Sequence, residues 1–499
     1  MTPTIDTVPL AAVAARPRLR FGRRILPLAA GLGLVTRWAF AGALGLGFFV
    51  AVLALVAAFA LAGGVESVQR ARAARSWVVA ALFFAAMVAL RDSPELTAFN
   101  VLAVVGLLGL AARDAVAAPE RTRLLDFPRS TLEAARGSLS STLEVGREAV
   151  AQALELKERA PGSTASVLRG LALACPVVLV LTALLASGDD HFHDALSGVT
   201  GTVPDLVLLA TDWACWSLVS GALAGGSLTW ALRRRPLDRA DHAMPMARRT
   251  VGATEGLIVL GSVVLVFAAF LAVQAAWLFS QDPSARGTGL TYATWARKGF
   301  GELTVVALLT WWLVELTRKH VTATGGADLA LRSASSAVLA QALVLLVSAH
   351  QRLALYDQVY GFSVTRIFAH AGLAFLGLGL VTRLATLWVA KGSSAQWVVA
   401  SALGVLAALN LLDPDAFVVR ANLARTSATV QTDWWYLSQL SADAAPALAA
   451  VARDGSNDAA LAHFACRMSA QQVTSLSGFN FSRAALGHER VGDCGDEDH

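Results

Sequence analysis

The chain has 499 residues, of which 56% are apolar and only 15% are charged, and its mean hydropathy is +0.56. Soluble domains usually carry about 25% charged residues, so this composition excludes an ordinary soluble protein and predicts that lipid solvates much of the chain. The formal net charge of +5 reflects arginine-rich loops between apolar runs, which is typical of membrane topology and does not indicate nucleic-acid binding.

The N-terminal residues 1–24 are polar and contain five arginines, which predicts a basic cytoplasmic tail. The pair Arg23-Arg24 before an apolar run also resembles a twin-arginine export signal. However, Arg37 interrupts the run where a signal peptide needs it to be continuous. We therefore favour a retained tail over a cleaved signal.

The first apolar region, residues 25–64, has Arg37 as its one charged residue. A helix of this length would measure about 60 Å, roughly twice the thickness of a bilayer core. Glycines at 42, 45 and 47 offer a turn. The region therefore crosses the membrane twice, or it forms a re-entrant piece followed by one crossing.

Further apolar runs of membrane-spanning character follow, which gives about eleven spans if the first region crosses twice. They lie at 76–90, 96–112, 168–187, 203–232, 253–279, 300–317, 333–351, 363–390 and 395–412. The predicted fold is an all-α, polytopic transmembrane bundle with a small helical extracytoplasmic C-terminal region.

Loop charges predict the orientation of this bundle. Residues 113–167 contain eight Lys or Arg and residues 233–249 contain six, whereas residues 188–203 contain none. Because basic loops stay in the cytoplasm, the alternation requires a cytoplasmic N-terminus and an extracytoplasmic C-terminus. The chain then divides into a tail, N-terminal membrane helices, a cytoplasmic loop, the main bundle and an exported tail: 1–24, 25–112, 113–167, 168–412 and 413–499.

The cytoplasmic loop 113–167 contains a predicted amphipathic helix. Ser130 and Glu133 form a capping-box pattern at its start. Its apolar side chains recur at helical spacing at Leu132, Leu139, Leu143, Val150 and Leu154. The helix packs on the bundle or lies at the lipid surface, or it docks a membrane or cytoplasmic protein partner.

The C-terminal tail 413–499 has eleven acidic residues against six arginines. Its sequence predicts one helix from Trp434 towards Val451 and another from Asp458 to Ser469. Cys466 and Cys494 either pair in an oxidising exterior or remain two free thiols.

Four polar residues within predicted spans are candidates for intramembrane contacts: Asp212, Gln274, Gln341 and His370. Polar groups in spans usually face the bundle interior. Their simplest role is to hydrogen-bond neighbouring helices together. The alternative is a proton or ion relay centred on Asp212, which we expect at considerable depth in its span.

A denser set of polar, aromatic and cationic residues falls on the predicted outer face. It comprises Tyr292, Trp295, Arg297, Lys298, Glu302, His350, Arg352, Tyr356, Tyr360 and Arg366. The arginines favour an anionic group such as a lipid phosphate or a carboxylate. Glu302 would serve as a base or pair with Lys298. The alternative is an interfacial belt of aromatic and snorkelling basic side chains.

The loop at 188–194 contains a cluster of acids and histidines: Asp189, Asp190, His191, His193 and Asp194. Such groups can bind a divalent ion, but a short exposed loop is also expected to be polar, and we favour no metal. The sequence lacks Walker, GxSxG, HExxH and dinucleotide motifs, so no cofactor is expected.

Several motifs together are similar to a bacterial family of multi-pass membrane proteins, the domain of unknown function DUF4173. They are Arg91-Asp92-Ser93-Pro94 with Asn100, Leu184 to Ser187, Tyr292 to Leu303, and Arg352 to Arg366 with Asn422 to Arg425. The resemblance extends over about residues 80 to 450 and implies a bacterial inner-membrane location. It implies no activity.

Three functions remain open. The favoured one is a non-catalytic transport-like or signalling scaffold component that binds an anionic or lipid ligand on its outer face. The second is an integral membrane enzyme that acts on a lipid-linked or phosphate-bearing substrate, with Glu302 or His350 as the base. The third is a structural partner within a membrane complex.

Overall fold

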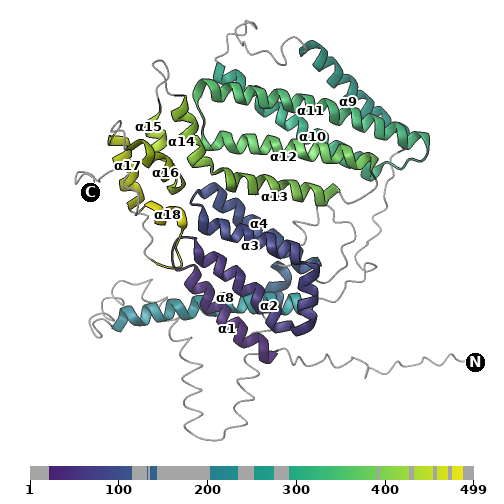
Figure 1. Ribbon diagram of the computed structural model, residues 1–499. Helices are drawn as coiled ribbons and strands as arrows, with labels where there is room; N and C mark the ends of the chain where they lie inside the picture. The colour runs from purple at the N-terminus through teal and green to yellow at the C-terminus, as the bar shows by residue number, and fades with distance from the viewer. Residues whose placement is uncertain are drawn as a thin grey trace, which may run out of the picture. The chain divides into compact units, whose positions relative to one another are not determined.

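The computed structural model of the chain is all-α, as the sequence predicted (Figure 1). It describes residues 22–114, 132, 135–142, 203–233, 252–274, 292–389, 394–425, 432–452, 458–469 and 475–486. These residues contain sixteen helices and no strand. The helices are α1 (Gly22–Ala39), α2 (Leu46–Ala73), α3 (Arg75–Leu90), α4 (Pro94–Asp114), α8 (Val203–Arg233), α9 (Ala253–Gln274), α10 (Tyr292–His320), α11 (Gly326–Tyr360), α12 (Val364–Trp388), α13 (Ser394–Leu412), α14 (Pro414–Ala424), α15 (Trp434–Ser438), η3 (Ala442–Ala444), α16 (Ala445–Ala452), α17 (Asp458–Ser469) and α18 (Phe481–Leu486).

The described helices include several that are long and apolar enough to cross a membrane. Four pass on length and composition, and a fifth is counted if α13 and α14 form one bent span. The four are Pro94–Ala112, Ala253–Ala272, Gly326–Tyr360 and Val364–Trp388. Shorter apolar helices occur at Ile25–Ala39, Leu46–Ala62 and Arg75–Leu90. These segments indicate a membrane protein.

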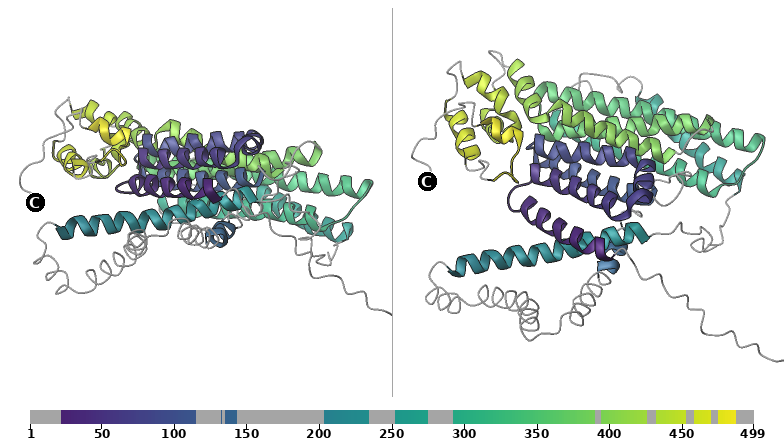
Figure 2. Two further views of the ribbon diagram at one scale, coloured as in Figure 1. Left: turned by 90° about the horizontal axis from the view of Figure 1, so that it is seen from below. Right: turned by 60° about the horizontal axis from the view of Figure 1, so that its bottom comes forward.

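The chain forms two compact units, and the first combines residues 1–41, 50–75 and 132–235. In this unit α1 lies along α8 (Figure 2). Leu32 of α1, Ala58 of α2 and Leu228 of α8 form a buried apolar contact. The turn predicted within residues 25–64 lies at residues 40–45, between α1 and α2, because glycine is a poor helix former.

Small residues allow α1 and α8 to approach closely. A Cβ atom added to Gly221 would lie 2.6 Å from the carbonyl oxygen of Ala29, and the Thr36 hydroxyl donates to that of Ser220 at 2.7 Å. Glycines at a helix interface let two backbones meet in this way. The small residues of α8 therefore form a packing surface.

A short part of the predicted cytoplasmic helix, residues 135–142, also belongs to the first unit. The hydroxyl of Thr142 contacts the carbonyl of Ala222 at 3.3 Å, so the small polar side of this segment meets α8. Leu132 and Leu139 are exposed. The predicted apolar face continues through Leu143, Val150 and Leu154, which lie outside the described residues.

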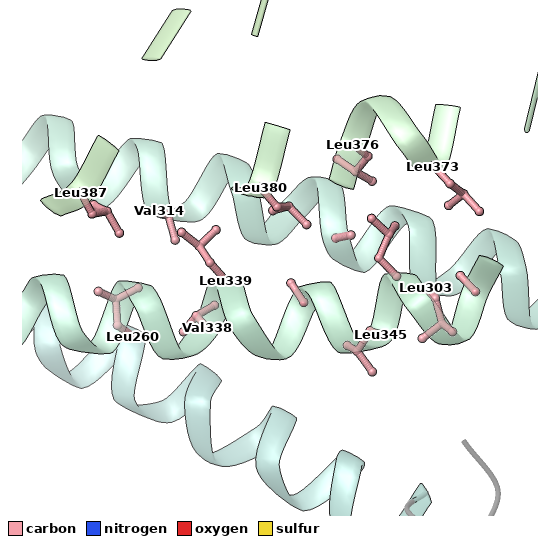
Figure 3. Close-up of a cluster of buried hydrophobic side chains, with 14 of the residues drawn as sticks. Leu260, Leu303, Val314, Val338, Leu339, Leu345, Leu373, Leu376, Leu380 and Leu387 are labelled. Atoms are coloured by element: carbon pink, nitrogen blue, oxygen red, sulfur yellow. The ribbon is translucent and has the colours of Figure 1, made fainter. Parts of the chain in front are cut away.

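The second unit contains α3, α4 and α9–α18. Helices α9, α11, α10 and α12 pack around a core of aliphatic side chains (Figure 3), in which Leu339, Leu345 and Leu380 are almost fully buried. α13 packs on α12. The helix pair α13–α14 bends by 57° at Asp413, which adopts a left-handed conformation, because the proline that follows it disfavours the helical conformation.

Residues 432–452, 458–469 and 475–486 form a helical C-terminal cap in the second unit. Its buried side chains, such as Leu437 and Phe464, share a core with Val418 of α14, Ile367 of α12 and Leu96 of α4. Apolar burial therefore fixes the cap to one end of these helices.

Cys466 in the cap is disulfide-bonded. Cys494, with which the sequence suggested a bond, lies outside the described residues.

Candidate functional site

A tight turn joins α11 to α12 and organises the site. Gly361 has φ 82° and ψ 177°, a conformation open essentially to glycine alone. The side chain of Asn422 accepts a hydrogen bond from the Phe362 N–H at 2.7 Å and donates to the Phe362 carbonyl at 2.9 Å. The Tyr436 hydroxyl accepts from the Val364 N–H at 2.9 Å. Side chains from α14 and the cap thus fix the backbone of the turn.

A buried carboxylate and two histidines form a chain of contacts beside this turn. Asp357 of α11 has 1% of its side chain exposed, and its Oδ2 lies 2.7 Å from Nε2 of His370 on α12. Nδ1 of His370 lies 3.1 Å from Nδ1 of His350, which is exposed. The contacts therefore run from a buried acid to an imidazole at the protein surface.

Hydrogen bonding determines which ring nitrogens carry protons when both histidines are neutral. An ionised Asp357 only accepts, so Nε2 of His370 donates to it and Nδ1 of His370 is left as an acceptor. Nδ1 of His350 then donates to His370. Nε2 of His350 keeps its lone pair. It is therefore the atom at which the two histidines can take up a further proton.

Two guanidinium groups converge on the same turn. Arg366 of α12 donates to the carbonyl of Gly361, and its Nη1 lies 3.8 Å from Oδ1 of Asp357. Arg425, at the end of α14, donates to the carbonyl of Gln358. Both groups complement the negative end of the α11 dipole. A guanidinium group has five N–H donors, so these contacts occupy only part of each.

A second polar network holds the loop between α3 and α4. The Asp443 carboxylate accepts from the N–H groups of Asp92 and Ser93 at 3.0 Å. In return the Asp92 carboxylate accepts from the Ala442 N–H at 3.1 Å and from Nε of Arg483 at 2.5 Å. Burial raises the pKa of the Asp92 carboxyl, and the positive charge of Arg483 opposes that rise. The two acids clamp the loop and the cap to each other.

The same loop is tied to α13. The side-chain amides of Asn100 and Asn410 exchange two hydrogen bonds of 2.9 Å and are fully buried. Arg91 donates to the Asn410 carbonyl at 2.8 Å and pairs with Asp413. Buried polar groups are stable only when they are paired, and these partners satisfy one another.

A family model for a domain of unknown function, DUF4153, matches residues 78–451. The chain belongs to the DUF4153 family. The resemblance to DUF4173 inferred from short motifs was wrong. Apolar spans with polar residues at their ends occur in more than one family of membrane proteins, so such motifs do not distinguish one family from another. No curated protein and no solved structure matches the chain.

The DUF4153 match includes both polar networks, from Asp92 to Asp443. The motif residues that suggested DUF4173 have clear structural contacts here. Asp92 holds the α3–α4 loop, Asn100 joins α4 to α13, and Asn422 and Arg425 hold the α11–α12 turn. The family description assigns no activity to these contacts.

The structure brings four of the predicted site residues together. His350 and His370 contact each other, and the Arg366 guanidinium lies over the Tyr356 ring, 4.4 Å from its centroid. On α11, Arg352 is buried, whereas Tyr360 is half exposed and has its ring centroid 4.8 Å from that of Tyr356. These residues, predicted to recur every four positions on one helix face, therefore extend along α11 from the protein interior to its surface.

The remaining predicted residues are not part of this group of contacts. Glu302 on α10 is exposed, and Gln341 donates to the carbonyl of Val264 on α9 at 3.2 Å. The backbone positions of five others lie in α9 or α10, but their side chains lie outside the described part of the structure: Gln274, Tyr292, Trp295, Arg297 and Lys298.

Asp212 lies on α8 and forms an ion pair with α1. Its side chain is 57% exposed and pairs with Arg37 of α1, whose guanidinium also lies over the Trp213 ring at 4.8 Å. The sequence predicted Asp212 at considerable depth in its span and did not identify this partner. The two charges that interrupt apolar helices neutralise each other, which lowers the cost of both in a membrane.

Sequence reasoning missed Asp357 and Asp443. Asp357 follows His350 by seven residues, which is two helical turns and the same helix face, so this spacing was an available signal. Asp443 had none, because its partners at 92 and 93 are about 350 residues away. The acidic and His-rich loop 188–194 lies outside the described residues, and within those described no group of three or more His, Cys, Asp or Glu is placed to hold a metal.

Proposed function

We propose that the chain is a multi-pass protein of the bacterial inner membrane with about eleven crossings. Its N-terminus and the loop 113–167 lie in the cytoplasm, and residues 413–499 lie outside. The arginine-rich loops support this orientation. The disulfide at Cys466 supports it independently, because disulfides persist in oxidising compartments.

Cysteine labelling tests the orientation. Gln439→Cys places an exposed thiol in the C-terminal cap, and Thr324→Cys places one in the loop between α10 and α11. In intact cells a membrane-impermeant maleimide is expected to label position 439, and to label position 324 only after permeabilisation. Mass spectrometry of the labelled peptides separates these sites from the native cysteines. Labelling of 324 but not 439 in intact cells would reverse the proposed topology.

We further propose that the α11–α12 turn binds an anionic ligand, a phosphate-bearing lipid headgroup or a free oxyanion, on the outer face. The supporting observation is the convergence of Arg366 and Arg425 on the Gln358–Gly361 carbonyls. Arginine presents several donors in a plane that suits phosphate and carboxylate oxygens. α11 is long enough, at 35 residues, for its end to extend beyond a bilayer core of about 30 Å.

The apolar centre of the bundle supports a binding role over a continuous transport path. A cluster of ion pairs lies near the opposite ends of these helices, where Asp328 contacts Arg318 at 2.8 Å and Arg332 at 2.7 Å. Leu339, Leu346 and other aliphatic side chains lie between this cluster and the His350 region. We therefore propose a non-catalytic signalling or transport-like component.

Calorimetric titration of the full chain in uncharged detergent tests the ligand. Dioctanoyl phosphatidylglycerol is expected to bind, dioctanoyl phosphatidylcholine to bind at least tenfold more weakly, and sulfate to report whether an oxyanion alone suffices. Arg366→Gln is expected to weaken phosphatidylglycerol binding by roughly 10- to 100-fold, because a hydrogen bond to a charged group contributes about 1.5–3 kcal/mol. Arg420→Gln, an exposed arginine on α14, is the matched control and is expected to change affinity less than about twofold.

Two results would contradict the proposed ligand. One is equal affinity for the anionic and zwitterionic lipids. The other is an Arg366→Gln variant that keeps its folding temperature and wild-type affinity.

An enzyme acting on the same phosphate-bearing ligand is the alternative. The observation that favours it is the orientation of His370 by a buried carboxylate, which resembles the arrangement of a general base. His350 would then be the group that receives the proton. Turnover of the bound lipid, lost in His350→Gln with binding intact, would favour the enzyme.

A further inference from the structure

We propose that binding of the anionic ligand near Arg366 is coupled to the uptake of one proton by the His350–His370 pair. This inference rests on the proposed ligand site and adds its regulation. Protonation of the histidine pair makes the net charge beside the α11–α12 turn depend on pH. The ligand then binds more tightly in an acidified exterior.

The contact between the two rings limits the pair to one additional proton. Nδ1 of His350 and Nδ1 of His370 face each other at 3.1 Å, so a single proton lies between them. If both nitrogens carried protons, two N–H donors would point at each other. The open position for another proton is Nε2 of His350, which the exposed ring presents to the surface.

The buried acid extends this effect to the arginine. Oδ2 of Asp357 contacts His370 at 2.7 Å, and Oδ1 lies 3.8 Å from Arg366. With neutral histidines, the Asp357 and Arg366 charges cancel. One proton on the pair leaves a net positive charge beside the turn. The added charge lies on the exposed His350 ring, so solvent screens part of it, and its effect reaches Arg366 through the His370 and Asp357 contacts.

Most charged groups around the pair do not titrate in the same pH range, and the exception is Asp415 of α14, whose pKa is raised by burial to about 6. Arg352 is on α11, Arg425 follows α14, and Tyr436 of the cap contacts the turn. Arginines stay charged and an ordinary tyrosine stays neutral near pH 7. On α10, Glu302 is exposed. The histidines and Asp415 are the groups whose charge changes between about pH 5 and 8, and replacing the histidines separates their contribution from that of Asp415.

Linkage gives the coupling a measurable size. If the ligand prefers the protonated pair, affinity falls by up to tenfold for each unit of pH between the pKa of the free pair and the higher pKa of the ligand-bound pair. The phosphodiester of phosphatidylglycerol and the sulfate ion keep a constant charge over this range. Any proton uptake on binding therefore comes from the protein.

Calorimetry in buffers of different ionisation enthalpy measures that uptake directly. Between the pKa of the free pair and that of the bound pair, the wild-type chain in detergent is expected to take up as much as one proton per dioctanoyl phosphatidylglycerol, and its affinity is expected to fall by up to tenfold per pH unit. The double variant His350→Gln/His370→Gln is expected to bind without uptake and with a flat pH profile. His350→Gln alone leaves the His370 imidazole in place and is expected to retain uptake. The same measurement with sulfate tells a free oxyanion from a lipid headgroup.

His320→Gln, which replaces a histidine at the far end of α10, is the matched control and is expected to keep the wild-type uptake. Binding of phosphatidylglycerol without proton uptake, or uptake that persists in the double variant, would overturn the coupling and leave the ligand site standing. Failure of the wild-type chain to bind either anion at any pH would instead remove the proposed function itself.

Discussion

Replacing Asp443 with alanine is expected to destabilise the second unit by about 3–5 kcal/mol, the largest effect among single substitutions in the cap. The carboxylate accepts from the N–H groups of Asp92 and Ser93 and from the Ser482 hydroxyl. Alanine leaves the Asp92 and Ser93 N–H groups buried without acceptors, and each such group costs about 1–3 kcal/mol, whereas the Ser482 hydroxyl can still donate to the Leu90 carbonyl. Thermal unfolding in detergent measures the loss, and limited proteolysis reports release of the cap.

Asp433→Ala is the matched control for Asp443→Ala. Asp433 is an exposed acid in the same cap whose side chain accepts from the Tyr436 N–H at the start of a short helix. Removing a side chain that accepts from an N–H group in the first turn of a helix costs about 1 kcal/mol. Asp443→Asn keeps one acceptor oxygen and is expected to fall between the two. Equal destabilisation by Asp433→Ala and Asp443→Ala would show that the contacts of Asp443 with the α3–α4 loop add no more stability than one hydrogen bond at the start of a helix.

Gly361→Ala is expected to cost about 1–3 kcal/mol in backbone strain and, in addition, to disrupt the ligand site. Its φ of 82° is unfavourable for a residue with a Cβ atom. The added Cβ would lie 2.7 Å from Oδ1 of Asn422, the group that fixes the turn. We expect a lower unfolding temperature and a loss of phosphatidylglycerol affinity of at least tenfold.

Gly372→Ala on α12 is the control for the turn. No heavy atom lies within 4 Å of a Cβ added there, and alanine is favoured over glycine in a helix by up to about 1 kcal/mol. This variant is expected to be as stable as the wild type or slightly more stable. A Gly361→Ala protein with wild-type stability and affinity would mean that the turn relaxes without disturbing Arg366 and His370.

The histidine cluster illustrates how far local sequence reasoning reached. His350, Arg366 and His370 were each selected because polar residues at the ends of apolar runs are costly without a role. The contact between them depends on the turn at Gly361, which folds α12 back along α11. Asp357 was overlooked although helical spacing placed it on the face of His350. Periodicity identifies a shared face but does not indicate which neighbouring helix covers it.

The amino-acid sequence by itself determined that this DUF4153 protein is helical and lipid-solvated, because those properties follow from composition, hydrophobic run length and local glycine content. It also determined the break between α1 and α2. Only the tertiary structure decided that Asp443 clamps a loop some 350 residues away, that Asp212 pairs with Arg37, and that Asp357 links two histidines to an arginine. These contacts join distant segments, and their partners are chosen by the packing of whole helices, which no local pattern encodes.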